Sequence, residues 1–147
     1  MRILVDADAC PVKNIIEKVA KIFSIDVIMF IDTSHVLESN YSKIIQVDQG
    51  KDAVDLAIIS STKKGDIVIT GDYGVASLVL SKGAYAISFN GMYYTNQNID
   101  RLLFERHLSS SIRRSGKKSG HIKKRSVNMD VNFENALYKL CESIKSH

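Results

Sequence analysis

Short apolar runs alternate with amphipathic stretches over the first ninety residues of the chain. Runs of this length, bounded by polar or glycine-containing turns, predict buried strands, here at 2–5, 27–31, 44–47, 67–70 and 84–89. Between them, apolar residues recur at helical spacing over 11–23, 51–63 and 75–82. Strands that alternate with helices are typical of a parallel sheet covered on both faces. We therefore predict an α/β fold: a three-layer sandwich around a mostly parallel sheet of about five strands.

The pattern changes after Asn90. A helical period is visible over 99–108 and again over 132–144, where Phe133, Leu137 and Leu140 share one stripe. Between these helices, residues 109–125 are rich in serine, glycine and basic side chains, which predicts a mobile basic loop. We interpret residues 1–147 as a single domain, with an α/β core over 1–90 and a helical extension over 91–147.

Composition supports an ordinary globular domain. The chain has 147 residues, of which 45% are hydrophobic and 24% charged. Its apolar runs are shorter than the roughly 18 residues that a membrane span needs, so we expect no membrane association. The first strand begins at once, and we expect no signal peptide. Cys10 and Cys141 lie far apart in sequence, as is usual in a reducing compartment, so we predict a cytoplasmic protein.

The net charge of +4 is unevenly placed, because basic residues gather between Arg101 and Arg125 beside a single acid, Glu105. Such a split favours a polyanion-binding arm next to a more acidic part of the chain. Phosphate contacts dominate nucleic-acid affinity, although a solvated basic loop without a partner is equally compatible with this composition. The candidate nucleic-acid-binding residues are Arg113, Arg114, Lys117, Lys118, Lys123, Lys124 and Arg125.

Carboxylates gather at three places in the predicted fold. Asp6 and Asp8 end the first strand and, two residues apart, point to the same face. Asp52 and Asp55 are three residues apart near the start of a predicted helix. Asp72 follows the strand at 67–70. The first and fourth strands can be neighbours in a parallel sheet, and their carboxyl ends would then bring these groups together.

Carboxylates that share one site repel one another unless a cation lies between them. Mg²⁺ or Mn²⁺ prefers oxygen ligands, and two such ions can support phosphodiester cleavage. Each acid also has a structural interpretation: Asp72 as a helix cap, Asp52 as a first-turn acid, and Asp8 as an acceptor for amides near Pro11. Taken together, the five acids predict a metal site. We assign catalytic roles to Asp6, Asp8, Asp55 and Asp72, and prefer Asp55 over Asp52 as the ligand from the helix.

The same residues carry a family resemblance. The segments DADACPVK at 6–13, DQGKDAVD at 48–55 and TGDYGVA at 70–76 resemble the YaiI/YqxD family of uncharacterised bacterial proteins over nearly the whole chain. That family in turn resembles PIN-domain nucleases, which implies a PIN-like fold and a divalent-metal site. By this resemblance Asp6 is the acid after strand one, Asp52 or Asp55 the helix acid, and Asp72 the later acid. Asp8 is an additional acid of the family's own motif.

Three functional hypotheses follow. The first is a metal-dependent nuclease that acts on RNA or DNA, with RNA the favoured substrate, as a monomer or a homodimer. The second is a haloacid-dehalogenase-type phosphatase with Asp6 as nucleophile and Asp8 as general acid. It lacks the acid expected shortly after Asp72, because positions 73–77 hold none. The third is a nucleic-acid-binding module without turnover.

Overall fold

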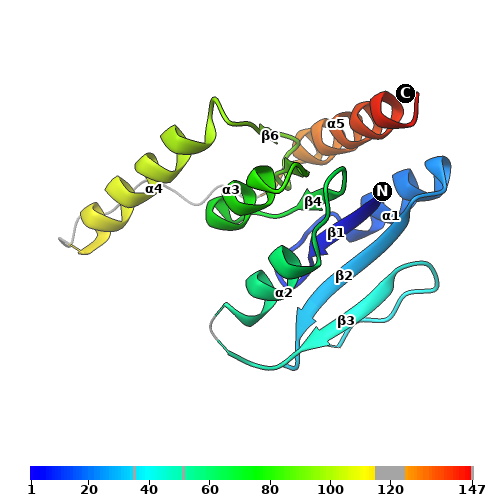
Figure 1. Cartoon of the computed structure of the whole chain (residues 1–147), viewed down its shortest axis with the longest axis horizontal. Coiled ribbons are helices and arrows are strands. Elements are labelled where there is room, and N and C mark those ends of the chain that lie inside the picture. Colours follow the sequence, from blue (N-terminus) through cyan, green and yellow to red (C-terminus); the bar gives the residue numbers. More distant parts are fainter. Residues whose placement is uncertain (35, 51, 115–124, 147) are drawn as a thin grey trace.

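A computed structural model describes residues 1–34, 36–50, 52–114 and 125–146 (Figure 1). Six strands form one sheet in the order β3-β2-β1-β4-β5-β6, and every neighbouring pair is parallel except β5 with β6. The strands are β1 (Arg2–Asp6), β2 (Asp26–Asp32), β3 (Lys43–Val47), β4 (Ile67–Ile69), β5 (Tyr85–Ile87) and β6 (Tyr93–Tyr94). The five predicted strands are confirmed. The antiparallel β6 was not predicted, because two residues are too short to show a period.

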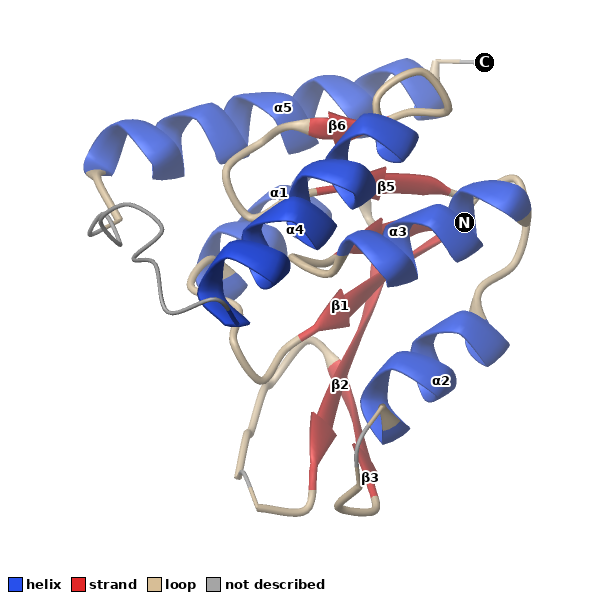
Figure 2. Ribbon diagram, turned by 90° about the vertical axis from the view of Figure 1, so that its left-hand side faces the viewer, coloured by secondary structure: helices blue, strands red, loops and turns tan. Residues whose placement is uncertain are grey.

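Helices cover both faces of the sheet, as the continuous apolar strands require (Figure 2). They are α1 (Lys13–Phe23), α2 (Ala53–Ser61), α3 (Tyr73–Ser81), α4 (Ile99–Arg114) and α5 (Val127–Lys145). The helices α1 and α5 pack on the face that carries Ile3 and Val5. The helices α2, α3 and α4 pack on the face that carries Leu4 and Val68. The three-layer α/β sandwich is therefore confirmed.

The C-terminal part differs from its prediction. Residues 109–114, expected to begin the basic loop, form the end of α4, since serine lowers helix propensity only modestly and the run contains neither glycine nor proline. The remaining predicted loop residues up to 124 lie outside the described residues. Figure 1 shows α4 projecting away from the sheet beyond α3. The last helix begins five residues earlier than predicted, at Val127, because Ser126 caps it by accepting a hydrogen bond from the Met129 backbone N–H.

The start of α2 also differs. The helix begins at Ala53, and Asp52 occupies its N-cap with a left-handed backbone, φ 68°. Asp52 therefore precedes the helix and does not share a helical face with Asp55, contrary to the prediction. Among the residues that the structure describes, no helix combines the length and the apolar character needed to cross a bilayer.

Candidate functional site

The site lies where the chain reverses its direction across the sheet. From β1 the chain adds β2 and then β3 on one side, and it returns to place β4 on the other side of β1. Such a switch point leaves a crevice at the carboxyl ends of the two diverging strands, where open α/β sheets bind ligands. Asp6 is the last residue of β1, and Thr70 directly follows β4. The topology thus brings the two strand ends together, as the sequence predicted.

Thr70 joins the two strand ends through hydrogen bonds. Its hydroxyl donates to Asp6 Oδ2 at 3.2 Å and accepts from the Asp72 backbone N–H at 3.0 Å. The residue is completely buried, so its position is fixed by the surrounding core. Thr70 was not among the predicted site residues. The signal available was a hydroxyl residue at the carboxyl end of a strand, directly before Gly71 and Asp72.

Asp72 caps a helix and also belongs to the acidic cluster, so both interpretations given for it from the sequence apply. Its Oδ1 accepts a hydrogen bond from the Val75 backbone N–H at 3.0 Å, which caps α3 and fixes the side chain. The same carboxylate raises the pKa of both Asp6 and Asp55, so its charge also reaches the other acids. The cap is a structural role that orients the carboxylate toward the site.

The acids affect one another's pKa values. Burial raises the pKa of Asp6 to about 6, helped by the Asp55, Asp8 and Asp72 carboxylates and opposed by the hydrogen bond from Thr70. Burial also raises the pKa of Asp55, as do the charges of Asp72 and Asp52, while Arg106 lowers it. The structure therefore brings the predicted acids within electrostatic reach of one another.

Asp8 and Asp52 each link this cluster to a neighbouring part of the fold. Both carboxylate oxygens of Asp8 face the Asp32 backbone N–H at 3.3 Å, which ties Asp8 to the end of β2. Asp52 lines a cavity of about 300 Å³ between α2 and α3, together with Asp55, Asp72 and the exposed Leu56. Asp55 belongs to both this cavity and the set of charges around Asp6, which favours it over Asp52 as the residue at the centre of the site.

The donor chemistry of the site fits Mg²⁺ or Mn²⁺, because carboxylate oxygens that repel one another are the ligands such ions prefer. The described residues contain no preassembled group of three or more His, Cys, Asp or Glu side chains placed to hold a metal ion. Asp6, Asp55 and Asp72 would therefore have to come closer together to share one bound ion.

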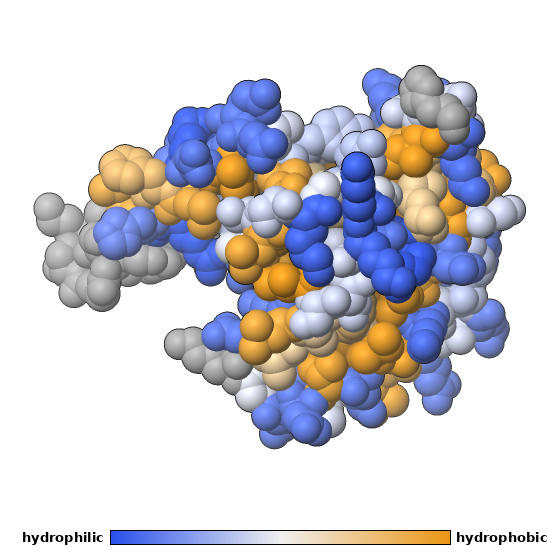
Figure 3. All heavy atoms as spheres, in the orientation of Figure 1, coloured by the Kyte–Doolittle hydropathy of each residue, from blue (hydrophilic) through white to orange (hydrophobic). Residues whose placement is uncertain are grey.

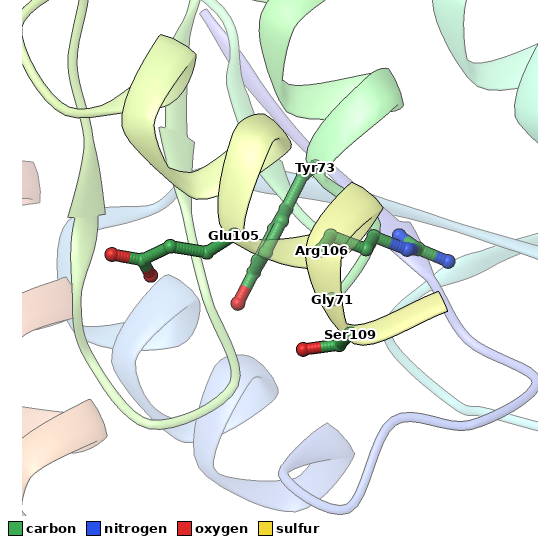
Figure 4. Close-up of a pocket in the computed structure, with 5 residues that line it drawn as sticks. All are labelled: Gly71, Tyr73, Glu105, Arg106 and Ser109. Carbon is green, nitrogen blue, oxygen red and sulfur yellow. The ribbon is translucent and has the colours of Figure 1, made fainter. Parts of the chain in front are cut away.

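A second hollow adjoins the acids. It has a volume of about 450 Å³ and is lined by Gly71 and Tyr73 from the β4–α3 connection and by Glu105, Arg106 and Ser109 from α4 (Figure 4). We call it the Tyr73–Arg106 cleft. None of these five residues was among the predicted site residues. Arg106 was visible as part of the basic region, but its place depends on how α4 packs beside α3, which the local sequence does not specify.

The predicted nucleic-acid-binding residues are only partly described. Arg113 and Arg114 end α4, whereas Lys117, Lys118, Lys123 and Lys124 lie outside the described residues. The guanidinium of Arg125 donates from Nε to Asp130 Oδ1 at 2.5 Å and also donates to the Phe89 carbonyl oxygen. Arg125 thus fastens the start of α5 to the end of β5, whatever contact it makes with nucleic acid. Figure 3 shows hydrophilic and apolar residues intermingled along α4, among them the exposed Phe104 and Leu108.

Comparison with known proteins gives long and close sequence matches. A profile of the family described as "Uncharacterized BCR, YaiI/YqxD family" matches residues 4–143. A UPF0178 protein of Ruminiclostridium cellulolyticum is 57% identical over 137 residues, which cover 93% of this chain and 90% of the relative. UPF0178 proteins of Lachnoclostridium phytofermentans and Clostridium tetani are each 53% identical, over 149 and 146 residues, with 99% of this chain and 100% of the relative covered. No solved structure matches the chain significantly.

Proposed function

Since this chain belongs to the YaiI/YqxD family, whose name carries no activity, we propose from the site itself that it is a divalent-metal-dependent nuclease that hydrolyses phosphodiester bonds, with RNA preferred to DNA. The observation that supports this proposal is the convergence of Asp6, Asp55 and Asp72 at the switch point of the sheet. A carboxylate held with a pKa of about 6 is costly for a purely structural group. A bound cation would stabilise the ionised carboxylate and so offset the cost of burying it.

Each acid has a role in this proposal. Asp6, Asp8, Asp55 and Asp72 would hold Mg²⁺ or Mn²⁺, with Asp52 at the rim. When bound, the ion supplies a water molecule acidified for attack and stabilises the charge that develops on the leaving oxygen. Thr70 holds the Asp6 carboxylate in place, and the cap of α3 does the same for Asp72. The chain's own contribution is thus a set of oxygen donors brought to one edge of the sheet.

The basic residues extend the proposal to the substrate. Arg113, Arg114, Lys117, Lys118, Lys123 and Lys124 would contact phosphates outside the acidic site, and their charge would offset the repulsion between the acids and a polyanion. Arg125 joins this group with its guanidinium already engaged by Asp130, so we expect it to contribute less to affinity. A cytoplasmic location remains part of the proposal.

The protein is incubated with Mn²⁺ and labelled single-stranded RNA, and cleavage of the RNA is measured. Single-stranded DNA of the same sequence is tested in parallel. We expect Asp6→Asn, Asp55→Asn and Asp72→Asn each to lower the rate by roughly 100-fold or more, because each removes a charged oxygen ligand. The substitutions are isosteric, and an asparagine at position 72 can still cap α3. Asp26→Asn, at an exposed acid at the start of β2, is the matched control and should cleave like the wild type.

Three outcomes would contradict the proposal. Cleavage that survives Asp6→Asn unchanged would show that this site does not perform it. A beryllofluoride adduct on Asp6 would favour the phosphatase hypothesis, in which Asp6 is the nucleophile. Salt-sensitive RNA binding without any cleavage would favour a binding module.

A further inference from the structure

The Tyr73–Arg106 cleft opens beside the acidic site on the surface between α3 and α4. Its volume of about 450 Å³ lies in the range of small-ligand sites, and polar and charged groups from α4 line one wall. Gly71 is exposed and also lines the cleft, and a Cβ atom on it would lie 3.0 Å from the Phe89 ring. Because Gly71 stands between Thr70 and Asp72, the cleft borders the acids directly.

Tyr73, the aromatic residue of the cleft, packs against a second tyrosine. The Tyr73 ring meets the Tyr94 ring edge-on, with 5.8 Å between the centroids. Tyr94 is buried, and its hydroxyl donates to the Thr70 carbonyl oxygen at 3.1 Å. Thr70 is also the residue that holds Asp6. Tyr73 is therefore positioned by the same residues that position the acidic site.

Arg106 supplies a positive charge at the border between the cleft and the acids. Its guanidinium carbon lies 5.9 Å from the centroid of the Tyr73 ring, a cation–π arrangement that orients an otherwise exposed side chain. Its charge also reaches Asp55, whose pKa it lowers. The neighbouring Glu105 points away from Arg106 (Figure 4) and forms an exposed ion pair with Arg101 at 3.0 Å, a kind of pair that contributes little.

A planar guanidinium with this placement suits a phosphate, which it can bind through two parallel hydrogen bonds. We propose that the Tyr73–Arg106 cleft binds a backbone phosphate of a single-stranded nucleic acid, next to the phosphodiester cleaved at the acidic site. Arg106 contacts the phosphate oxygens, and Tyr73 is a positioning residue that acts through Arg106. This inference rests on the proposed nuclease function.

The experiment compares two arginines of the same helix. Arg106→Gln removes the charge from the cleft, while Arg101→Gln removes an exposed arginine of α4 that does not line it. Binding of fluorescein-labelled single-stranded RNA is measured by anisotropy in EDTA at several salt concentrations. We expect Arg106→Gln to weaken binding about 10-fold and to reduce the slope of log K against log[salt] by about one phosphate contact. Arg101→Gln should stay within about 2-fold of the wild type.

Cleavage kinetics in Mn²⁺ separate a binding role from a structural one. Arg106→Gln should raise KM about 10-fold and leave kcat within about 3-fold, because a contact to a non-reacting phosphate acts on ground state and transition state alike. Arg106→Lys should recover part of the loss. Tyr73→Leu should raise KM by freeing Arg106, whereas Tyr73→Phe should not, since it keeps the ring.

The possible failures are distinct. Equal binding and equal salt slopes for Arg106→Gln and Arg101→Gln would overturn the cleft inference, and the nuclease proposal would stand if Asp6→Asn still abolished cleavage. Cleavage that persists in Asp6→Asn would overturn the nuclease proposal. A wild-type protein that neither binds nor cleaves RNA would overturn both.

Discussion

Asp6 is costly to keep ionised. Its carboxyl is largely buried beside other acids, and its pKa of about 6 means that the folded protein holds this proton to a higher pH than the unfolded chain does. The stability of the metal-free fold should therefore be greatest below about pH 4 as far as this group is concerned. It should fall as the pH rises through about 6, where the folded carboxyl ionises.

This cost leads to a prediction for the metal-free protein. Asp6→Asn should raise the free energy of unfolding at pH 7 by about 2 kcal/mol, a value reduced from the full pKa difference because the group is partly exposed. The variant should also lose the part of the decline in stability between pH 4 and 6 that Asp6 causes. Urea denaturation in EDTA measures both effects. Asp26→Asn is the control, and an Asp6→Asn protein no more stable than the wild type would contradict the prediction.

At the scale of elements, Asp66 connects the start of β4 to the start of β1. It is 3% exposed and accepts hydrogen bonds from the Arg2 backbone N–H at 3.1 Å, the Arg2 side chain at 2.7 Å and the Lys63 backbone N–H at 2.9 Å. Burial would raise the pKa of Asp66, but these hydrogen bonds and the Arg2 charge lower it. The ion pair thus helps to hold the two central strands in register.

Removing this carboxylate should destabilise the protein. We expect Asp66→Ala to lower the free energy of unfolding at pH 7 by about 3 kcal/mol, because Arg2 and two amides lose their acceptor. Since the pKa of Asp66 is lowered by folding, its contribution is complete above about pH 4 and disappears as the pH falls further. Chemical denaturation at pH 7 and pH 3 should therefore show a smaller difference from the wild type at pH 3. A difference that does not change with pH would show that charge is not the cause.

The strands and helices that could be predicted were those whose own residues show a clear apolar pattern. The apolar runs predicted at 2–5, 27–31 and 67–70 correspond to β1, β2 and β4, because strands buried on both faces are mostly apolar. The length of α4 could not be predicted, since its final turns have little apolar period. The left-handed backbone of Asp52 was also missed, because an aspartate in this conformation looks like any other acid at a helix start.

The site was predictable to the extent that topology determined it. Asp6 and Asp72 end or follow strands that proved to be neighbours, so their convergence followed from the alternation of strands and helices. Arg106 and Tyr73 required the packing of α4 beside α3, which only the tertiary structure supplies. Thr70 is buried and uncharged, so a prediction based on clustered acids did not include it.

At the scale of the whole molecule, α5 returns from the end of the chain to cover the face on which α1 lies. Phe133, Leu137 and Cys141 are completely buried there. The turn between β5 and β6 fits closely against this helix: Gly91 has φ +91°, and a Cβ atom on it would lie 2.7 Å from the Asn132 carbonyl oxygen. The close approach links the edge of the sheet to the last helix.

Two glycines with similar backbones test this contact. Gly91→Ala should lower the free energy of unfolding by about 3 kcal/mol, through both backbone strain and displacement of α5. Gly65→Ala should lower it by only about 1 kcal/mol, since Gly65 has φ +88° but nothing lies within 4 Å of the added Cβ. Thermal or urea unfolding of the two variants gives the comparison. Equal losses would show that strain alone accounts for both.

The hydrogen bond between Thr70 and Asp6 spans 64 positions of the chain. During synthesis, Asp6 and Asp8 leave the ribosome long before Thr70 and Asp72, and pairings between residues so distant form late in folding. A growing chain that has not yet produced β4 therefore contains Asp6, Asp8, Asp52 and Asp55 but lacks Thr70 and Asp72. The acidic site can therefore form only after most of the polypeptide has been made. A fragment that ends before β4 carries the motifs at 6–13 and 48–55 without the complete site.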